Sequence, residues 1–330
     1  MRLGIIGTNW ITEEFVAAAH ASGKWTLNAV YSRNHERAKT FAEPFHVTDI
    51  YTNIEAMAQS DDIDAVYIAS PNSLHFEQAI AFLKEKKHVI VEKPVFSTLD
   101  EFDRAHTIAN EHGVYLLEAA RHMFEPNFKE LQQHVSRVGD IHSAFFVFAK
   151  YSSRYDQVLE GEEPNIFSLN FSGGSLVDLG VYPLYTAVAL FGVPRSATYN
   201  PQIISTGVDG GGPIVLQYEG FSVTIFQAKN SNSFLHNEIH GVNGTLKFDN
   251  IAGIEEIQWL DNRSADPIEL AVRSSEENKM QFEAEAFANL IEKNDRETYE
   301  VLTSLSRNVL SLMCQLRHDN GLYFAVEQQH

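Results

Sequence analysis

The first 120 residues alternate short apolar runs with helical segments, and this alternation is the strongest constraint on the fold. Apolar runs typical of buried strands occupy residues 3–6, 26–31, 48–51, 65–69, 89–91 and 114–117. Segments with the apolar spacing of amphipathic helices separate most of them, for example residues 10–21 and 99–111. The pattern predicts an α/β fold in which a parallel sheet is doubly wound by helices.

The character of the sequence changes after Arg121. A predicted helix at 127–138 precedes strand-like runs at 141–148, 220–228, 238–248 and 255–260. Turn signals at 242–244 and at the glycine-rich residues 209–212 join these runs, which predicts a large, mainly antiparallel open sheet. Amphipathic helices are expected at 280–291 and 304–316. We therefore predict two domains, 1–121 and 122–330, the second of the α+β class.

Charge and cysteine content narrow the classes of function. The chain has 44 acidic and 25 basic residues and a net charge of −19, which argues against a nucleic-acid partner or an anionic membrane surface. Cys314 is the only cysteine, so an internal disulfide is excluded and a reducing compartment fits. The predicted first strand follows directly after Met1 and Arg2, and no apolar run approaches a membrane span. We therefore expect a soluble, cytoplasmic protein without a signal peptide.

Residues 88–94, HVIVEKP, place a carboxylate and an ammonium group at the end of a buried strand. In open α/β sheets this edge is where ligands bind, and Pro94 ends the strand because it has no N–H group. Lys93 is therefore a candidate for proton transfer. Considered alone, the tripeptide is better explained by a solvated Glu–Lys pair before a turn.

The loop after the first strand is a partial match to a dinucleotide-binding motif. Such motifs have the pattern G-x-G-x-x-G, and only Gly7 of the sequence GTNWIT (7–12) matches. Asn9 stands where the backbone approaches a pyrophosphate, and asparagine tolerates left-handed conformations. Thr12 stands where close helix–strand packing prefers a smaller residue. A strand–turn–helix without a ligand explains this loop equally well when it is considered alone.

The second strand is followed by Ser32 and Arg33 instead of an acidic residue. An acidic side chain there would bind the ribose of NAD, whereas a hydroxyl and a guanidinium suit the 2′-phosphate of NADP. The pattern favours NADP over NAD. The alternative is an arginine exposed on a surface loop.

Five motifs occur in order along the chain: LGIIGT (3–8), YSR (31–33), SPNSLH (70–75), EKP (92–94) and GGSLVDLGVY (173–182). In this combination the sequence resembles the glucose–fructose oxidoreductase / inositol dehydrogenase / rhizopine-catabolism (Gfo/Idh/MocA) family, and within it the dihydrodiol dehydrogenase-like branch. The resemblance spans most of the chain. It implies a Rossmann domain that binds a dinucleotide, followed by a substrate-binding domain whose open sheet often mediates oligomerisation. We accordingly expect a homo-oligomer formed through the C-terminal sheet.

The resemblance also implies an NAD(P)-dependent oxidoreductase that transfers hydride between a nicotinamide and a carbinol or carbonyl carbon of a sugar, polyol or related diol. Lys93 then occupies the position of the substrate-binding, proton-transferring lysine, Tyr182 that of a tyrosine or histidine, and Asp178 that of its acidic partner. The predicted cofactor-binding residues are Gly7, Thr8, Asn9, Trp10, Ile11, Ser32, Arg33, Ser70, Pro71, Asn72, His75, Glu92 and Lys93.

The chemistry of hydride removal explains the need for these residue types. A carbinol becomes a carbonyl only if its hydroxyl proton also departs, so a base is required, and a desolvated lysine has its neutral form favoured. Asp178 and Tyr182 are spaced i, i+4 and so share one helix face. Without Lys93, Tyr182 would be better explained as an aromatic residue packed near the start of a helix.

Other interpretations remain open at this point. The second functional hypothesis is a catalytically silent dinucleotide-binding regulator, since a Rossmann fold can bind its cofactor without using it. His236 and His240 resemble a metal-binding pair, but residues i, i+4 on a strand lie too far apart for one ion, so we expect no metal. The polar segment 151–167 is compatible with a substrate-side loop or a surface excursion. His122, with Glu118, is a further hypothesis for the cleft.

Overall fold

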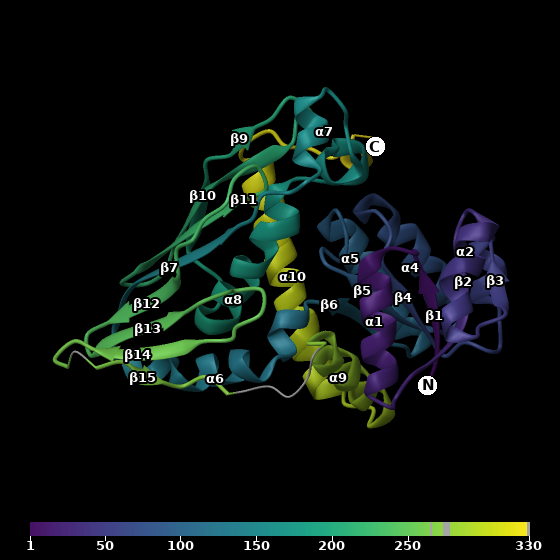
Figure 1. Ribbon diagram of the computed structural model, residues 1–330, viewed down its shortest axis with the longest axis horizontal. Helices are drawn as coiled ribbons and strands as arrows, with labels where there is room; N and C mark the ends of the chain where they lie inside the picture. The colour runs from purple at the N-terminus through teal and green to yellow at the C-terminus, as the bar shows by residue number, and fades with distance from the viewer. Residues whose placement is uncertain (265, 273–277, 329–330) are drawn as a thin grey trace. The chain divides into compact units, whose positions relative to one another are not determined.

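The computed structural model describes residues 1–264, 266–272 and 278–328, and the chain forms two compact units (Figure 1). Unit 1 comprises Met1–Ala120 and Glu276–Arg307, and unit 2 comprises Arg121–Ser275 and Asn308–His330. The change of sequence character at Arg121 thus coincides with the step from one unit to the other. Residues 276–307 return to the first unit.

Unit 1 is built on a six-stranded parallel sheet with the strand order β3-β2-β1-β4-β5-β6. Its strands are β1 (Arg2–Ile6), β2 (Thr26–Tyr31), β3 (Asp49–Tyr51), β4 (Ala65–Ile68), β5 (His88–Glu92) and β6 (Leu116–Ala119). All four residues of β4 are buried, as expected for a central strand with both faces covered. The predicted doubly wound sheet is confirmed.

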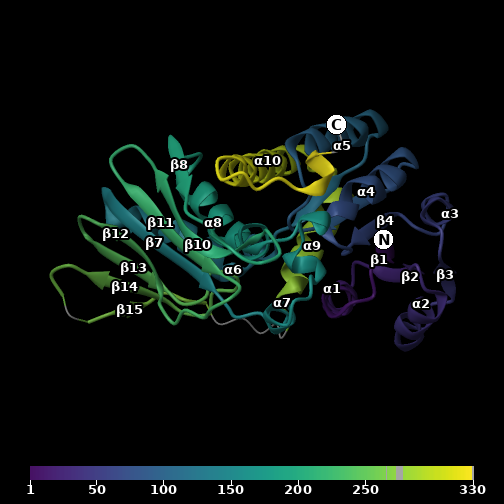
Figure 2. The same cartoon turned by 90° about the horizontal axis from the view of Figure 1, so that it is seen from above.

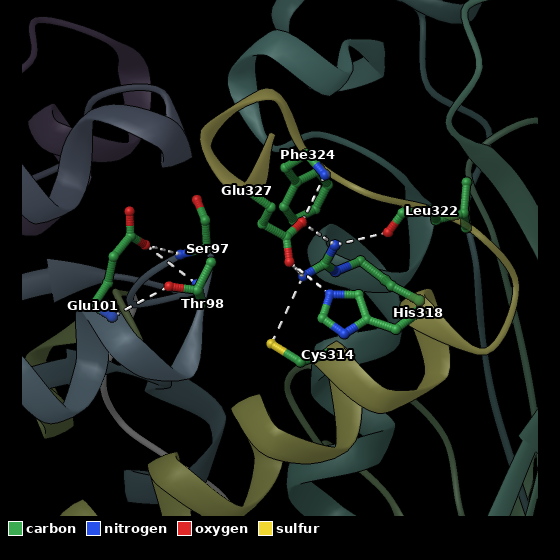
Figure 3. Close-up of polar contacts among 9 residues, drawn as sticks. Ser97, Thr98, Glu101, Cys314, His318, Leu322, Phe324 and Glu327 are labelled. Carbon is green, nitrogen blue, oxygen red and sulfur yellow. Dashed lines mark hydrogen bonds and ion pairs between the residues drawn. The ribbon is translucent and has the colours of Figure 1, made fainter. Parts of the chain in front are cut away.

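Helices cover both faces of this sheet, with α1 packed against α9 and α4 packed against α5 (Figure 2). The helices of unit 1 are α1 (Trp10–Ala21), α2 (His35–Ala42), α3 (Ile54–Ala58), α4 (His75–Lys84), α5 (Leu99–His112), α9 (Met280–Glu292) and the first part of α10 (Arg296–His318). A capping box starts α5: Thr98 Oγ1 accepts from the Glu101 amide at 3.2 Å, and the Glu101 carboxylate accepts from the Thr98 amide at 3.2 Å (Figure 3). Gly113 ends α5 in a left-handed conformation.

Unit 2 contains a nine-stranded mixed sheet with the order β15-β14-β13-β12-β7-β11-β10-β8, and β9 pairs with β10. The β7–β11 pair is parallel and the other pairs are antiparallel. The strands are β7 (Ile141–Ala149), β8 (Ser196–Tyr199), β9 (Gln202–Ile203), β10 (Asp209–Gln217), β11 (Ser222–Ala228), β12 (Asn237–Gly241), β13 (Gly244–Phe248), β14 (Ile257–Asp261) and β15 (Ile268–Glu269). The predicted α+β class and mainly antiparallel sheet are confirmed.

Residues 209–212 differ from the prediction of a turn, because they begin strand β10. Gly211 lies opposite Ala228 of β11, and a Cβ atom on Gly211 would lie 2.8 Å from the Ala228 Cα. On Gly212 it would lie 2.3 Å from the carbonyl oxygen of Asn200. These glycines therefore permit close backbone approach within the sheet. The turn predicted at Asn243 does join β12 to β13.

One face of this sheet packs against α8 (Val181–Phe191), and α6 (Pro126–His134), α7 (Tyr155–Leu159) and the last part of α10 complete unit 2 (Figure 2). Within the described part of the chain, one stretch, Leu169–Phe191, is long and apolar enough to cross a membrane. The expectation that no run approaches that length was therefore wrong. In the structure 72% of its apolar window is buried, the pattern of a core segment in a soluble protein.

A buried arginine of α10 contacts the segment that follows this helix (Figure 3). Arg317 Nη1 donates to the Leu322 carbonyl oxygen at 2.9 Å and to Glu327 Oε2 at 2.8 Å. The guanidinium also lies 3.7 Å from the centroid of the Phe324 ring. His318 Nε2 lies 2.6 Å from Glu327 Oε1. These contacts fix the terminal turn, Ala325–Glu327, within unit 2.

Candidate active site

The predicted cofactor-binding residues of unit 1 follow the ends of four strands. Gly7 follows β1, Ser32 follows β2, residues 70–72 follow β4, and Lys93 follows β5. Because all six strands are parallel, these positions lie at one edge of the sheet. The strand order reverses between β1 and β4, and ligands of doubly wound folds bind at that switch point.

The loop after β1 is held to the end of β4. Gly7 has φ +105°, and a Cβ atom there would lie 2.7 Å from the Ala69 carbonyl oxygen. Asn9 donates its Nδ2 to that same oxygen at 2.9 Å, and its Oδ1 accepts from the Thr12 amide at 3.1 Å. The backbone of Asn9 is extended, so its tolerance of left-handed conformations is not used here: Asn9 is the N-cap of α1.

Thr12 is fully buried, and its hydroxyl has a hydrogen-bond partner, Asn9 Oδ1, at 3.2 Å. Its size is thereby accommodated where a smaller residue was expected. Trp10 is 72% exposed at the start of α1, and Ile11 is half-buried beside it. The N-terminus of α1 therefore opens at the sheet edge with its amide groups and positive dipole end, which favour a bound anion.

A cavity of about 650 Å³ lies beside this loop, within unit 1. Residues of α1, of α2 and of the segments that follow β1, β2 and α2 line it: Thr8, Glu13, Asn34, Glu36, Arg37, Thr40, Phe41, Pro44 and Phe45. Asn34 caps α2 by accepting from the Arg37 amide at 3.0 Å. Arg33 is exposed and is not among the lining residues. Arg37, in the first turn of α2, was not singled out from the sequence.

His75 joins the loop after β4 to the loop after β5. Its Nε2 lies 2.9 Å from the Ser70 carbonyl oxygen, and its Nδ1 lies 3.1 Å from the Pro94 carbonyl oxygen. The side chain is fully buried, and this burial lowers the pKa of the imidazole. His75 therefore supports the loops that carry the predicted cofactor contacts, and Pro71 and Asn72 are half-buried on the first of them.

Lys93 is half-buried between two fixed points of the loop after β5. On one side, the buried Tyr67 hydroxyl donates to Glu92. On the other side, the Val95 amide donates to Glu118 Oε1 at 3.0 Å. Tyr67 could not be singled out from the sequence, because its partner lies on the neighbouring strand. These contacts anchor the residues on both sides of Lys93 at the sheet edge.

In unit 2, Asp178 and Tyr182 occupy consecutive turns at the start of a buried helix. Asp178 lies on the π turn η7 (Leu176–Gly180), and Tyr182 is the second residue of α8. Tyr182 is 8% exposed, with its ring 5.2 Å from Phe148 and 4.9 Å from His122 between centroids. The aromatic packing considered as the alternative for Tyr182 is therefore present.

A buried polar network holds the glycine-rich entry to this turn. A Cβ atom on Gly174 would lie 2.3 Å from Asp209 Oδ1, so the backbone passes directly over that carboxylate. Asp209 Oδ2 accepts from the Leu176 amide at 2.6 Å and from the Tyr199 hydroxyl at 2.6 Å. Gln227 Nε2 donates to the Tyr199 hydroxyl at 2.8 Å. Burial raises the pKa of Asp209 and that of Tyr199.

His240, one member of the possible metal pair, lies on β12 and has other contacts. Its Nδ1 lies 2.9 Å from Ser143 Oγ, and its Nε2 lies 2.7 Å from Glu238 Oε2. Among the residues that the structure describes, no group of three or more histidine, cysteine, aspartate or glutamate side chains is arranged to hold a metal ion. In segment 151–167, Tyr155 starts α7 and Asn165 starts a short 3-10 turn.

Comparison with known proteins gives consistent results. Residues 1–119 match the family model GFO_IDH_MocA, described as an oxidoreductase family with an NAD-binding Rossmann fold. The chain is 42% identical over 327 residues to the uncharacterized oxidoreductase YgjR of Escherichia coli, covering 99% of this chain and 98% of that protein. It is 39% identical over 330 residues to scyllo-inositol 2-dehydrogenase (NADP(+)) IolU of Bacillus subtilis, covering 99% of each.

Among solved structures, KijD10, a 3-ketoreductase from Actinomadura kijaniata, superposes with a TM-score of 0.84 at 23% identity, covering 96% of this chain and 97% of that one. This likeness concerns the fold. The predicted oxidoreductase activity on CH–OH groups is confirmed by the curated relatives, and the silent regulator gains no support. The chain therefore belongs, as its five motifs predicted, to the Gfo/Idh/MocA family of nicotinamide-dependent oxidoreductases.

Proposed function

We propose that the protein is an NADP-dependent dehydrogenase of a cyclic polyol, with scyllo-inositol as the first substrate to test. The observation that carries this proposal is the position of Lys93, held between the Tyr67–Glu92 contact and the Val95–Glu118 contact at the carboxyl edge of the parallel sheet. The relative named scyllo-inositol 2-dehydrogenase (NADP(+)) supports the substrate and the cofactor, because its similarity extends over 99% of the chain.

The residues of unit 1 fit a phosphorylated dinucleotide. The exposed N-terminus of α1 and the tight Gly7 turn suit a pyrophosphate, which needs amide donors and close backbone approach. Arg37, Asn34 and Thr40 line the cavity beside them, and we assign the 2′-phosphate to this region together with Ser32 and Arg33. Glu13 and Glu36 also line the cavity, so the arginines must outweigh local negative charge.

The proposed reaction separates the hydride from the proton. When bound, the nicotinamide supplies the acceptor for the hydride that leaves the carbinol carbon. Lys93 Nζ takes the hydroxyl proton, which prevents a protonated carbonyl from accumulating. The Tyr182 hydroxyl is a second group that can exchange a proton with the substrate oxygen. Asp178, one helical turn before Tyr182, is a hydrogen-bond acceptor. The predicted division of labour assigns the cofactor to residues 1–121 and the substrate to residues 122–330.

We further propose a cytoplasmic homo-oligomer assembled through the nine-stranded sheet. The face of the sheet opposite α8 carries partly exposed apolar side chains in its central strands, among them Phe145, Val215 and Phe226. Burying such side chains against a second sheet would remove apolar area from water. Light scattering on a size-exclusion column tests this, and a strictly monomeric protein at micromolar concentration would refute it.

The decisive experiment for the activity is a steady-state assay with scyllo-inositol and NADP⁺, in which nicotinamide absorbance reports turnover. The same assay with NAD⁺, and with other polyols, aldoses and a trans-dihydrodiol, measures selectivity. Lys93→Met is the matched negative control, because it keeps the length of the side chain and removes the amine. Turnover of none of these substrates, or undiminished turnover by Lys93→Met, would contradict the proposal.

A further inference from the structure

Lys229 is a buried lysine in unit 2 that lies outside every motif of the sequence. It follows the last residue of β11, and its backbone is fixed on both sides: its amide donates to the Gly210 carbonyl oxygen at 2.8 Å, and its carbonyl accepts from the Ser152 amide at 2.8 Å. The position of its Cα atom is therefore set by two neighbouring segments of the chain. These backbone contacts do not determine the direction of the Lys229 side chain.

The side chain of Lys229 forms an ion pair with Asp178. Its ammonium group donates to Asp178 Oδ2 and lies 5.8 Å from the centroid of the Phe167 ring, which is fully buried. The exposed fractions are 9% for the Lys229 side chain and 22% for that of Asp178. Both charges are thus largely removed from water.

A largely buried ion pair of this kind adds little net stability to the folded state. Desolvation of two charges offsets much of their attraction, and apolar residues of similar volume are often at least as stabilising. The turn that carries Asp178 already has a separate anchor, because Asp209 binds the Leu176 amide at 2.6 Å. That anchor fixes the backbone of the turn, whereas Lys229 contacts the carboxylate itself. The contact between Lys229 and Asp178 is explained by a role in orienting the Asp178 carboxylate.

From this geometry we infer that Lys229 is a positioning residue for the reaction. It fixes the side-chain rotamer of Asp178 one helical turn before Tyr182, and it balances the charge of the carboxylate. The ion pair uses Oδ2, and a carboxylate offers about four acceptor sites, so the contact with Lys229 does not by itself saturate the carboxylate. Lys229 acts through Asp178 and takes no proton itself. This inference rests on the proposed function.

A double-mutant cycle tests the inference on the full-length protein. The variants are Lys229→Met, Asp178→Asn and the combination of both, and the probes are scyllo-inositol and NADP⁺. Lys150→Met is the matched control, because Lys150 is an exposed lysine on a segment adjacent to the end of β11. The combined variant removes both charges, so it avoids leaving a buried carboxylate without its cation if Lys229→Met folds poorly.

We expect kcat of Lys229→Met to fall by about 10²-fold, because small misplacement of a site residue costs this much, while KM for NADP⁺ stays unchanged. In the Asp178→Asn background the same change should cost less than about threefold, since the residue through which Lys229 acts is already altered. Lys150→Met should match the wild type. A purely structural role would instead lower the unfolding midpoint of Lys229→Met and leave kcat of the folded fraction intact.

The outcomes separate the two proposals. Wild-type protein that oxidises none of the polyols overturns the proposed function, and the role of Lys229 in it falls as well. An active wild type with undiminished kcat in Lys229→Met overturns only the inference on Lys229. Equal losses from Lys229→Met in the wild-type and Asp178→Asn backgrounds also overturn it, because independent residues show additive effects.

Discussion

His88, the first residue of β5, should make the stability of unit 1 depend on pH. Its Nδ1 accepts a hydrogen bond from the Tyr115 amide at 3.1 Å, which requires a lone pair and hence an unprotonated Nδ1. Burial, helped by the nearby positive charge of Arg296, lowers the pKa of His88 to about 4. The unfolded chain binds this proton near pH 6.5, so acid favours unfolding. The stabilisation is present above pH 6.5 and is lost as the pH falls toward 4.

The size of the effect follows from the two pKa values. With a folded pKa of about 4 and an unfolded pKa near 6.5, His88 should lower the free energy of unfolding by about 2 kcal/mol between pH 7 and pH 5. His106 has a pKa of about 4 for the same reason, burial, so it adds a similar loss. A control is therefore needed that removes the titration of His88 alone.

His88→Gln provides that control, because the glutamine carbonyl oxygen can accept from the Tyr115 amide and does not titrate in this range. Urea unfolding followed by circular dichroism at pH 7 and pH 5 gives the free energies of unfolding. The wild type should lose about 2 kcal/mol more than His88→Gln between the two pH values. Equal losses in both proteins would refute the reasoning.

Three further predictions concern the candidate site. Lys93→Met should lower turnover by about 10²–10⁴-fold with cofactor binding retained, and Tyr182→Phe should cost less, as measured by steady-state kinetics and fluorescence titration with NADPH. Arg33→Ala or Arg37→Ala should weaken NADPH binding by about 1.5–3 kcal/mol and leave NADH binding nearly unchanged in calorimetry; equal losses for both cofactors would exclude a 2′-phosphate contact. Gly7→Ala should lower the free energy of unfolding by at least about 1 kcal/mol, because alanine is strained at a φ of +105°. An unchanged urea midpoint would contradict that last prediction.

The parallel sheet could be predicted because its evidence is local. Strands buried on both faces, such as residues 65–68, are continuous apolar runs, and helices with 3.6-residue spacing separate most of them. Lys93 was found for a related reason, since a charged residue directly after such a strand must lie at the sheet edge. Both inferences need only the order of residues along a short segment.

The supports of the site could not be predicted because they depend on distant partners. Lys229 meets a carboxylate 51 residues away, and the Asn9 amide meets the Ala69 carbonyl 60 residues away. Asp209 was assigned to a turn because three glycines follow it, and only the pairing of β10 with β11 shows that these glycines lie within a sheet. Which polar residues become buried is decided by strand register, and periodicity alone does not give the register of β10 against β11.

Unit 1 is assembled from two stretches of chain, and this has a consequence for its synthesis. The indole of Trp25, the residue before β2, donates to the Ala284 carbonyl oxygen of α9 at 2.8 Å, and Lys24 pairs with Glu292 at 2.8 Å. When the first 120 residues leave the ribosome, these partners have not yet been translated. The nascent sheet must therefore wait, with one apolar helix face uncovered, until nearly the whole chain has emerged.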